Sequence, residues 1–232
     1  MLLEEAKWLR EHVLQLSVSN QRVLNVGSST RHARTEAQPH MQSDLFDPLA
    51  ASGFNVTHTD LQPAEGVDLV GDLTDEAFLA KLLRDDYGLV LCTNVLEHVP
   101  QREALINALS ELPSPDGYLV VSVPKHYPYH YDPIDTMFRP GVKTLSAMFP
   151  TLKRVEGQVV KARRRQVKGN TVRTQKNYFR MLADNPRLAV LQMARTLLPF
   201  YKPRMWWYTV KYLCTMFRPF SVTCVILQRK RP

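Results

Sequence analysis

The chain has 232 residues, an apolar fraction of 44% and a formal net charge of +8 at pH 7. This length suits one α/β domain with an insertion. Its three cysteines, Cys92, Cys214 and Cys224, stand at no metal-ligand spacing, which argues against a zinc site and a disulfide framework. We expect Cys92 and Cys224, which lie in apolar runs, to be buried thiols in a reducing compartment.

Charge is distributed very unevenly along the sequence. Residues 1–150 hold 11 Lys and Arg against 20 Asp and Glu, whereas residues 151–232 hold 19 against 2. Such asymmetry predicts that the second part meets something anionic, such as nucleic acid, a phosphorylated substrate or a membrane surface. A solvated cationic helix face is the simpler alternative.

Strand-like and helical patterns alternate along most of the chain. Strands are predicted at residues 22–26, 55–59, 69–72, 89–93, 118–123, 152–160 and 221–227. Helices are predicted at residues 1–16, 44–51, 75–83, 102–112 and 139–149. This alternation predicts a doubly wound, mostly parallel α/β sheet of seven strands with right-handed crossovers.

The chain divides into three predicted parts. Residues 1–160 form the core, residues 161–219 a basic helical insertion or lid, and residues 220–232 the last strand and a basic tail. The charged N-terminal residues 1–20 do not read as a signal peptide, and no apolar run of about 18 residues predicts a membrane span. We therefore expect a cytoplasmic protein, with a membrane surface as a further contact.

Small and acidic residues follow the first two predicted strands. Gly27, Ser28 and Ser29 form a tight turn after the first strand, and Asp60 ends the second. In doubly wound folds, such a turn lets the backbone approach a ligand, and such an acid accepts hydrogen bonds from ribose hydroxyls. This pairing predicts an adenosine-like ligand.

The fourth strand runs into the string Asn94-Val95-Leu96-Glu97-His98-Val99, and residues 117–124 fit a fifth strand. With these motifs, residues 20–155 resemble class I S-adenosylmethionine-dependent methyltransferases, of the small-molecule group with a Leu-Glu-His helix start. The resemblance implies the Rossmann-like methyltransferase fold and S-adenosylmethionine as cofactor. The chain departs from the family at Asn25, where an acid is usual, and in the loop after Gly27, where further glycines are usual.

The resemblance also assigns cofactor contacts. It implies that Asn25 supports the loop, that Asp60 binds the ribose, and that Asp72, before Leu73, faces the adenine amino group. The full implied set is Asn25, Gly27, Ser28, Ser29, Asp60, Leu61, Asp72, Leu73, Asn94, Val95 and His98. Structural alternatives are a turn role for Asp60, a surface-loop role for Asp72 and a packed helix-start role for His98.

The loop after the fifth strand carries the predicted catalytic residues. His126 and His130 lie among tyrosines and prolines there, and either is suited to take a proton from a hydroxyl acceptor. His98 is the next candidate, while Asp132 and Asp135 could serve as base or hydrogen-bond acceptor. The alternative is that this loop only lines the acceptor site and that its histidines are merely hydrogen-bonded. We expect no catalytic metal.

Oxygen is the favoured acceptor atom, because the string at Asn94 lacks the Pro-Pro-aromatic sequence of exocyclic base methylation and no Pro-Cys pair is present. Three functions stay open. The first is O-methylation of a small-molecule, glycan or lipid-linked acceptor. The second is RNA methylation, with the basic part as platform. The third is a cofactor-binding module without catalysis.

Overall fold

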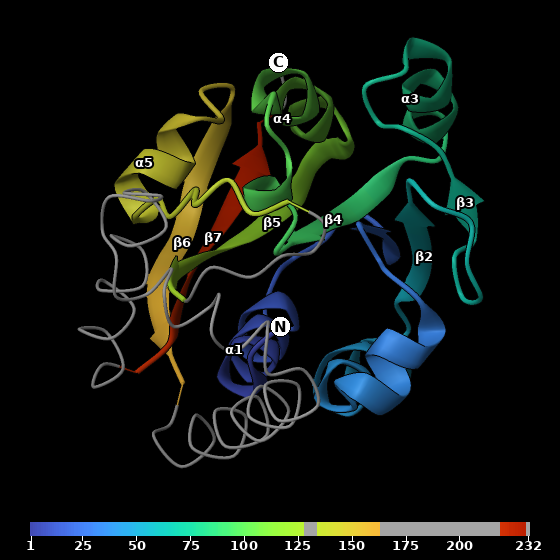
Figure 1. The fold of residues 1–232 in the computed structure, drawn as a ribbon. Coiled ribbons are helices and arrows are strands. Elements are labelled where there is room, and N and C mark those ends of the chain that lie inside the picture. The colour runs from blue at the N-terminus through green and yellow to red at the C-terminus, as the bar shows by residue number, and fades with distance from the viewer. Residues whose placement is uncertain (128–133, 163–218, 231–232) are drawn as a thin grey trace, which may run out of the picture.

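The computed structural model describes residues 1–127, 134–162 and 219–230. They form a seven-stranded sheet with the order β3-β2-β1-β4-β5-β7-β6 (Figure 1). The strands are β1 (Arg22–Val26), β2 (Asn55–Asp60), β3 (Leu69–Val70), β4 (Tyr87–Thr93), β5 (Pro113–His126), β6 (Leu152–Lys161) and β7 (Ser221–Arg229). β7 runs antiparallel to both its neighbours, β5 and β6, and the other neighbouring pairs of described strands are parallel. The predicted mostly parallel α/β sheet is confirmed.

Helices cover both faces of this sheet (Figure 1). The helical elements are α1 (Leu3–Val13), η1 (Ala33–Ala37), η2 (Gln42–Phe46), α2 (Asp47–Ala51), α3 (Glu76–Leu83), η3 (Leu96–His98), α4 (Arg102–Glu111) and α5 (Val142–Ala147). One hydrophobic cluster joins the sheet to α3, α4 and α5. A second cluster joins the opposite face to α1, η2 and α2.

Strand β4 shows why its sequence is an unbroken apolar run. Val90 and Cys92 belong to the first cluster, whereas Leu89 and Leu91 belong to the second. Successive side chains of a strand point to opposite faces, so a strand covered on both sides has apolar residues at every position. Cys92 and Cys224 are buried as predicted, and Cys214 lies outside the described residues.

Two predicted helices begin elsewhere in the structure. Residues 139–149 were expected to be helical from Pro140, but α5 begins only at Val142. The carbonyl of Pro140 accepts a hydrogen bond from Thr223 Oγ1 at 2.8 Å, which ties the main chain to β7 before the helix starts. The helix expected at residues 44–51 instead opens with the wide π-helical turn of η2.

Helix α1 runs across the sheet, with its first turn near the carboxyl ends of β4 and β5. Ala6, Leu9 and Val13 pack into the second cluster, and Trp8 Nε1 donates to Gln158 Oε1 of β6 at 2.7 Å. Among the described residues, no helix has the length and apolar character needed to cross a membrane. The predicted insertion at residues 161–219 lies outside the described part of the chain, apart from its ends.

Candidate active site

The loops after β1 and β4 meet where the strand order reverses. β1 lies between β2 and β4 in the sheet, and all three are parallel, so their carboxyl ends share one edge. Gly27, which follows β1, has a φ of +67°, and a Cβ there would lie 2.4 Å from Cγ2 of Val95. Both the backbone conformation and the lack of space require glycine at this position.

Asp60 joins the end of β2 to the loop after β1. Its Oδ2 accepts a hydrogen bond from the backbone N–H of Ser29 at 2.7 Å, and its Oδ1 accepts one from the N–H of Gln62 at 3.2 Å. Ser28, which is buried, donates its backbone N–H to the carbonyl of Thr59 at 3.0 Å. The structure therefore brings together the turn and the acid that the sequence singled out.

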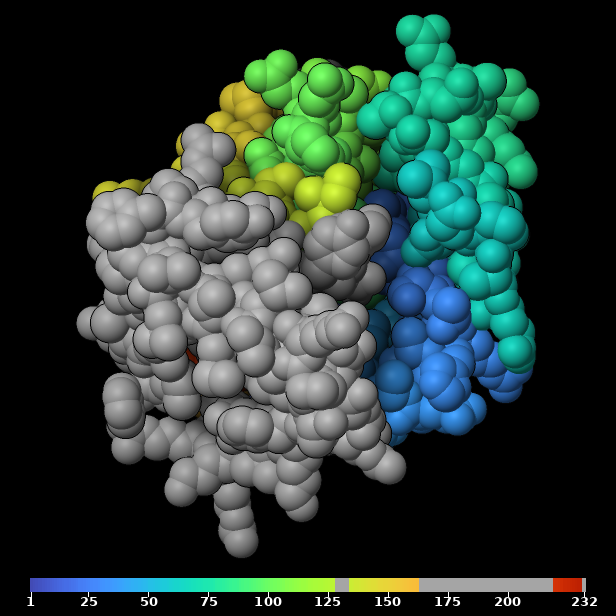
Figure 2. Space-filling model, viewed as in Figure 1, coloured from blue at the N-terminus to red at the C-terminus, as the bar shows by residue number. Residues whose placement is uncertain are grey.

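The side chain of Arg34, which was not predicted to be a site residue, holds the same loop in place. Its guanidinium donates to the carbonyls of Ser28 and Ser29, both at 2.8 Å, and to that of Gly66 at 2.7 Å. Burial lowers the pKa of this guanidinium, while Asp68 and Asp60 oppose the shift. Figure 2 shows the segment after β1 beside the segment between β2 and α3, the two segments that Arg34 links.

Asn25 forms a neutral pair with His58 across β1 and β2. Its Nδ2 lies 3.0 Å from His58 Nδ1, and the two residues are register partners in the parallel ladder. Burial and then the charge of Arg34 lower the pKa of His58 to about 4. The ring is therefore uncharged at neutral pH, and this part of the site carries no charge at the position where the resembled family has an acid.

The residues expected around the adenine differ in exposure. Leu61 exposes 58% of its surface directly after Asp60, whereas Leu73 is buried in the first hydrophobic cluster, so only the main chain of Leu73 can face a ligand. Asp72 is exposed, and its Oδ1 accepts hydrogen bonds from the backbone and the hydroxyl of Thr74.

Asn94 follows β4 in the left-handed conformation, with a φ of +54°. Its Nδ2 donates to Glu5 Oε1 at 2.8 Å, and Ser122 Oγ of β5 donates to the same oxygen at 2.5 Å. Glu5 was not predicted as a site residue. Its spacing of four and eight residues from Leu9 and Val13 places it on the buried face of α1, which is the sequence signal that could have identified it.

His98 lies beside a buried acid. Its Nδ1 is 2.6 Å from the carbonyl of Ile134, which can only accept, so Nδ1 carries the proton and the neutral ring has its lone pair on Nε2. Nε2 lies 3.7 Å from Glu97 Oε1. Glu97 is fully buried, and neither carboxylate oxygen accepts a hydrogen bond from another of the described residues.

The other predicted catalytic residues are only partly described. His126 ends β5, and the ring of the next residue, Tyr127, packs against Phe220 with centroids 4.9 Å apart. Asp135 is buried in an ion pair with Arg139, at 2.6 Å, so its carboxylate already has a strong partner. His130 and Asp132 lie outside the described residues.

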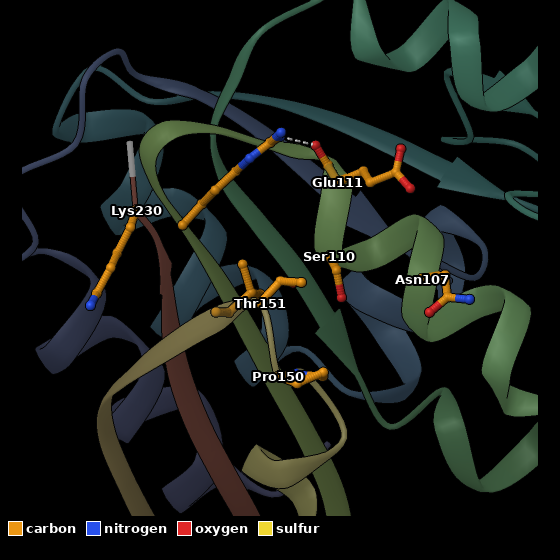
Figure 3. Close-up of a pocket in the computed structure, with 8 residues that line it drawn as sticks. Asn107, Ser110, Glu111, Pro150, Thr151 and Lys230 are labelled. Carbon is orange, nitrogen blue, oxygen red and sulfur yellow. Dashed lines mark hydrogen bonds between the residues drawn. The ribbon is translucent and has the colours of Figure 1, made fainter. Parts of the chain in front are cut away.

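A cavity of about 460 Å³ lies at the opposite end of the sheet, and Figure 3 shows the residues around it. It is lined by Asn107, Ser110, Glu111, Pro150, Thr151, Leu152, Arg229 and Lys230. These residues adjoin the amino end of β5, whereas the turn at Gly27, the acid Asp60 and the string that begins at Asn94 lie at the carboxyl ends of the parallel strands. We therefore place the site at those carboxyl ends. The described residues contain no cluster of metal-ligand side chains, and metal-independent catalysis stays a prediction.

Comparison with protein families decides the assignment. A family model for a methyltransferase domain matches residues 4–218. The chain belongs to this methyltransferase family. It is thus a class I S-adenosylmethionine-dependent methyltransferase, as its motifs led us to expect, and S-adenosylmethionine is its cofactor. No curated protein matches its sequence significantly.

Solved structures resemble this methyltransferase in fold. Coclaurine N-methyltransferase bound to N-methylheliamine and SAH has a TM-score of 0.54 and 17% identity, over 98% of this chain and 70% of that one. A SAM-dependent methyltransferase from Archaeoglobus fulgidus has a TM-score of 0.51 and 12% identity, over 97% and 92%. The [4+2]-cyclase SpnF has a TM-score of 0.50 and 12% identity, over 99% and 81%. At these identities the likeness concerns the fold alone.

The buried acid of the methyltransferase gives a prediction for stability. Burial raises the pKa of Glu97 to about 8, reinforced by Glu5 and Asp135 and opposed by its own backbone N–H and by Arg139. The folded protein therefore keeps this proton up to about pH 8, whereas the unfolded chain releases it near pH 4.5. The free energy of unfolding should fall as pH rises between these values, by about 1.4 kcal/mol for each unit of pKa difference.

Urea unfolding at several pH values from 5 to 9 measures this effect. Glu97→Gln should remove most of the fall, because it leaves no proton to release. Glu103→Gln, which removes an exposed carboxylate of α4, should keep it. Equal slopes for the wild type and Glu97→Gln would show that Glu97 is ionised in the folded protein at neutral pH.

Proposed function

We propose that the protein transfers the methyl group of S-adenosylmethionine to a hydroxyl oxygen of a small-molecule, glycan or lipid-linked acceptor, and that the carboxyl ends of β1, β2 and β4 form the reaction site. When bound, the cofactor supplies an electrophilic methyl group on a sulfonium. The hydrogen bond from Ser29 to Asp60 carries the proposal, because it joins the small-residue turn to the acid at the end of the neighbouring strand.

The residues at the carboxyl ends of β1, β2 and β4 suit the methyl donor, S-adenosylmethionine. The two oxygens of Asp60 each accept one hydrogen bond from the described residues, and a carboxylate has about four acceptor positions, so capacity remains for two ribose hydroxyls. The exposed Leu61 offers an apolar surface to the adenine, and Asp72 an acceptor to its amino group. We assign Gly27, Ser28 and Ser29 to the methionine end, with Asn94, Val95 and His98 beside the sulfonium.

Asp60→Ala tests this assignment. The substitution removes an ionised hydrogen-bond acceptor and should weaken S-adenosylmethionine binding by about 1.5–3 kcal/mol. Isothermal titration calorimetry measures the dissociation constant. Glu65→Ala is the matched control, since it removes an exposed acid from the next loop and should leave affinity unchanged. Equal affinities for Asp60→Ala and the wild type would falsify the ribose assignment.

A histidine takes the acceptor proton in this proposal, because a hydroxyl becomes a good nucleophile only as it loses that proton. His126, His130 and His98 are the candidates from sequence. The orientation of His98 supports it most directly, since the carbonyl of Ile134 sets its tautomer with the lone pair on Nε2. Glu97, 3.7 Å away, would stabilise the imidazolium once its own proton is lost.

Single substitutions of these histidines identify the base. General-base catalysis contributes about 10²–10⁴-fold in rate, so His98→Ala, His126→Ala or His130→Ala should lower kcat by that factor at saturating cofactor. The affected variant should also lose the acidic limb of the pH–rate profile while it still binds the cofactor. Near-normal rates for both His126→Ala and His130→Ala would show that the loop after β5 only lines the acceptor site, and His98 would then be the next candidate. Near-normal rates in all three variants would refute a histidine base. NMR of the product locates the added methyl group and separates O- from N-methylation.

We assign acceptor binding to residues 161–219, because this segment is strongly cationic and lies after the cofactor motifs. Replacing Arg163, Arg164 and Arg165 with Gln should weaken binding to an anionic acceptor or to vesicles of anionic lipid. The effect should be larger at low salt, where screening is weakest, with cofactor affinity unchanged. Salt-dependent binding of RNA would favour the RNA methyltransferase alternative. Loss of cofactor binding alone would refute this division of the chain.

A further inference from the structure

Glu5 is a fully buried carboxylate held by three hydrogen bonds. Its Oε1 accepts from Asn94 Nδ2 at 2.8 Å and from Ser122 Oγ at 2.5 Å. Its Oε2 accepts from the backbone N–H of Leu2 at 3.0 Å. All three partners are neutral groups, and each donates a hydrogen bond to the carboxylate.

This carboxylate has no counter-ion among the described residues. Every ion pair in that part of the chain involves other acids, and Glu5 forms none. Buried charges in proteins are normally paired, because removing a charge from water is otherwise strongly unfavourable.

This buried carboxylate lies at the edge that carries the cofactor motifs. Asn94 and Ser122 stand at the carboxyl ends of β4 and β5, and their backbones are joined by a hydrogen bond of 2.9 Å. The residue after Asn94 is Val95, whose side chain faces Gly27. Glu5 is therefore one hydrogen bond away from the point where the loops after β1 and β4 meet.

We propose that Glu5 is a positioning residue that supplies a fixed negative charge, which favours the sulfonium cation of S-adenosylmethionine over the neutral thioether of S-adenosylhomocysteine. This inference rests on the proposed binding of the donor at this edge. A ligand cation there supplies the positive charge that the described residues do not place beside Glu5. Methyl transfer removes that positive charge, so the same carboxylate holds the product less strongly than the substrate. In surroundings shielded from water, such an interaction is stronger than in solvent.

The electrostatic role differs measurably from a structural one. If Glu5 only shaped the loop at Asn94, its loss would weaken both ligands by a similar factor, because the two differ by one methyl group and one charge. If Glu5 acts through its charge, its loss weakens the charged ligand alone. The ratio of the two dissociation constants therefore separates the roles.

The experiment is calorimetric titration of the full chain with S-adenosylmethionine and with S-adenosylhomocysteine. For Glu5→Gln we expect the dissociation constant of S-adenosylmethionine to rise about tenfold and that of S-adenosylhomocysteine to change less than about threefold. Glu11→Gln, an exposed acid of the same helix, should leave both constants unchanged. Proportional changes in both constants, or no change in either, would overturn the proposal.

A second variant guards against a failure of Glu5→Gln to fold. Combining Glu5→Gln with Asn94→Asp exchanges the amide and the carboxylate, so that the pair keeps its hydrogen bond and its single negative charge. We expect this double variant to restore the wild-type ratio, and a ratio that stays low would contradict the charge mechanism. A wild-type protein that binds neither ligand would instead refute the proposed function.

Discussion

The close contact between Gly27 and Val95 is the constraint on which the site depends. Because β1 lies between β2 and β4, the loops after these strands leave the sheet at one edge, and there is no room for a Cβ at Gly27. The glycine lets the loop after β1 turn toward β2, where Ser29 meets Asp60. A larger residue at position 27 would strain the backbone and meet the side chain of Val95, so the loop after β1 or the loop after β4 would have to shift.

The fold and part of the site could be predicted because they depend on local patterns. Strand β4 is apolar throughout since both its faces are covered, and Asp60 is recognisable as the acid that ends a strand. Glu5, Arg34 and His58 were missed for a different reason. Each acts on a partner that lies near it only in the folded chain, such as Glu5 on Asn94 and His58 on Asn25. Sequence spacing alone does not bring such pairs together.

The two buried acids at this edge, Glu5 and Glu97, differ in their hydrogen bonding. Glu5 accepts three hydrogen bonds, from the side chains of Asn94 and Ser122 and from the backbone of Leu2. Glu97 accepts none from another described residue, and burial raises its pKa to about 8, so it keeps its proton at neutral pH. In our proposals Glu5 therefore supplies a fixed charge, whereas Glu97 becomes charged only when it loses its proton. The same residue type therefore supports an electrostatic role at one position and a proton-linked role at the other.

Arg34 has a consequence for how quickly a ligand can be accepted. Its three bonds to the carbonyls of Ser28, Ser29 and Gly66 cross-link the loops that follow β1 and β2. The entropy of ordering these loops is therefore lost when the chain folds rather than when a ligand arrives. A ligand can therefore bind without rearrangement of these loops. A ligand of the wrong shape binds weakly, because the loops do not adjust to it. Lysine could not replace this residue, because one ammonium cannot present the planar fork that reaches three carbonyls at once.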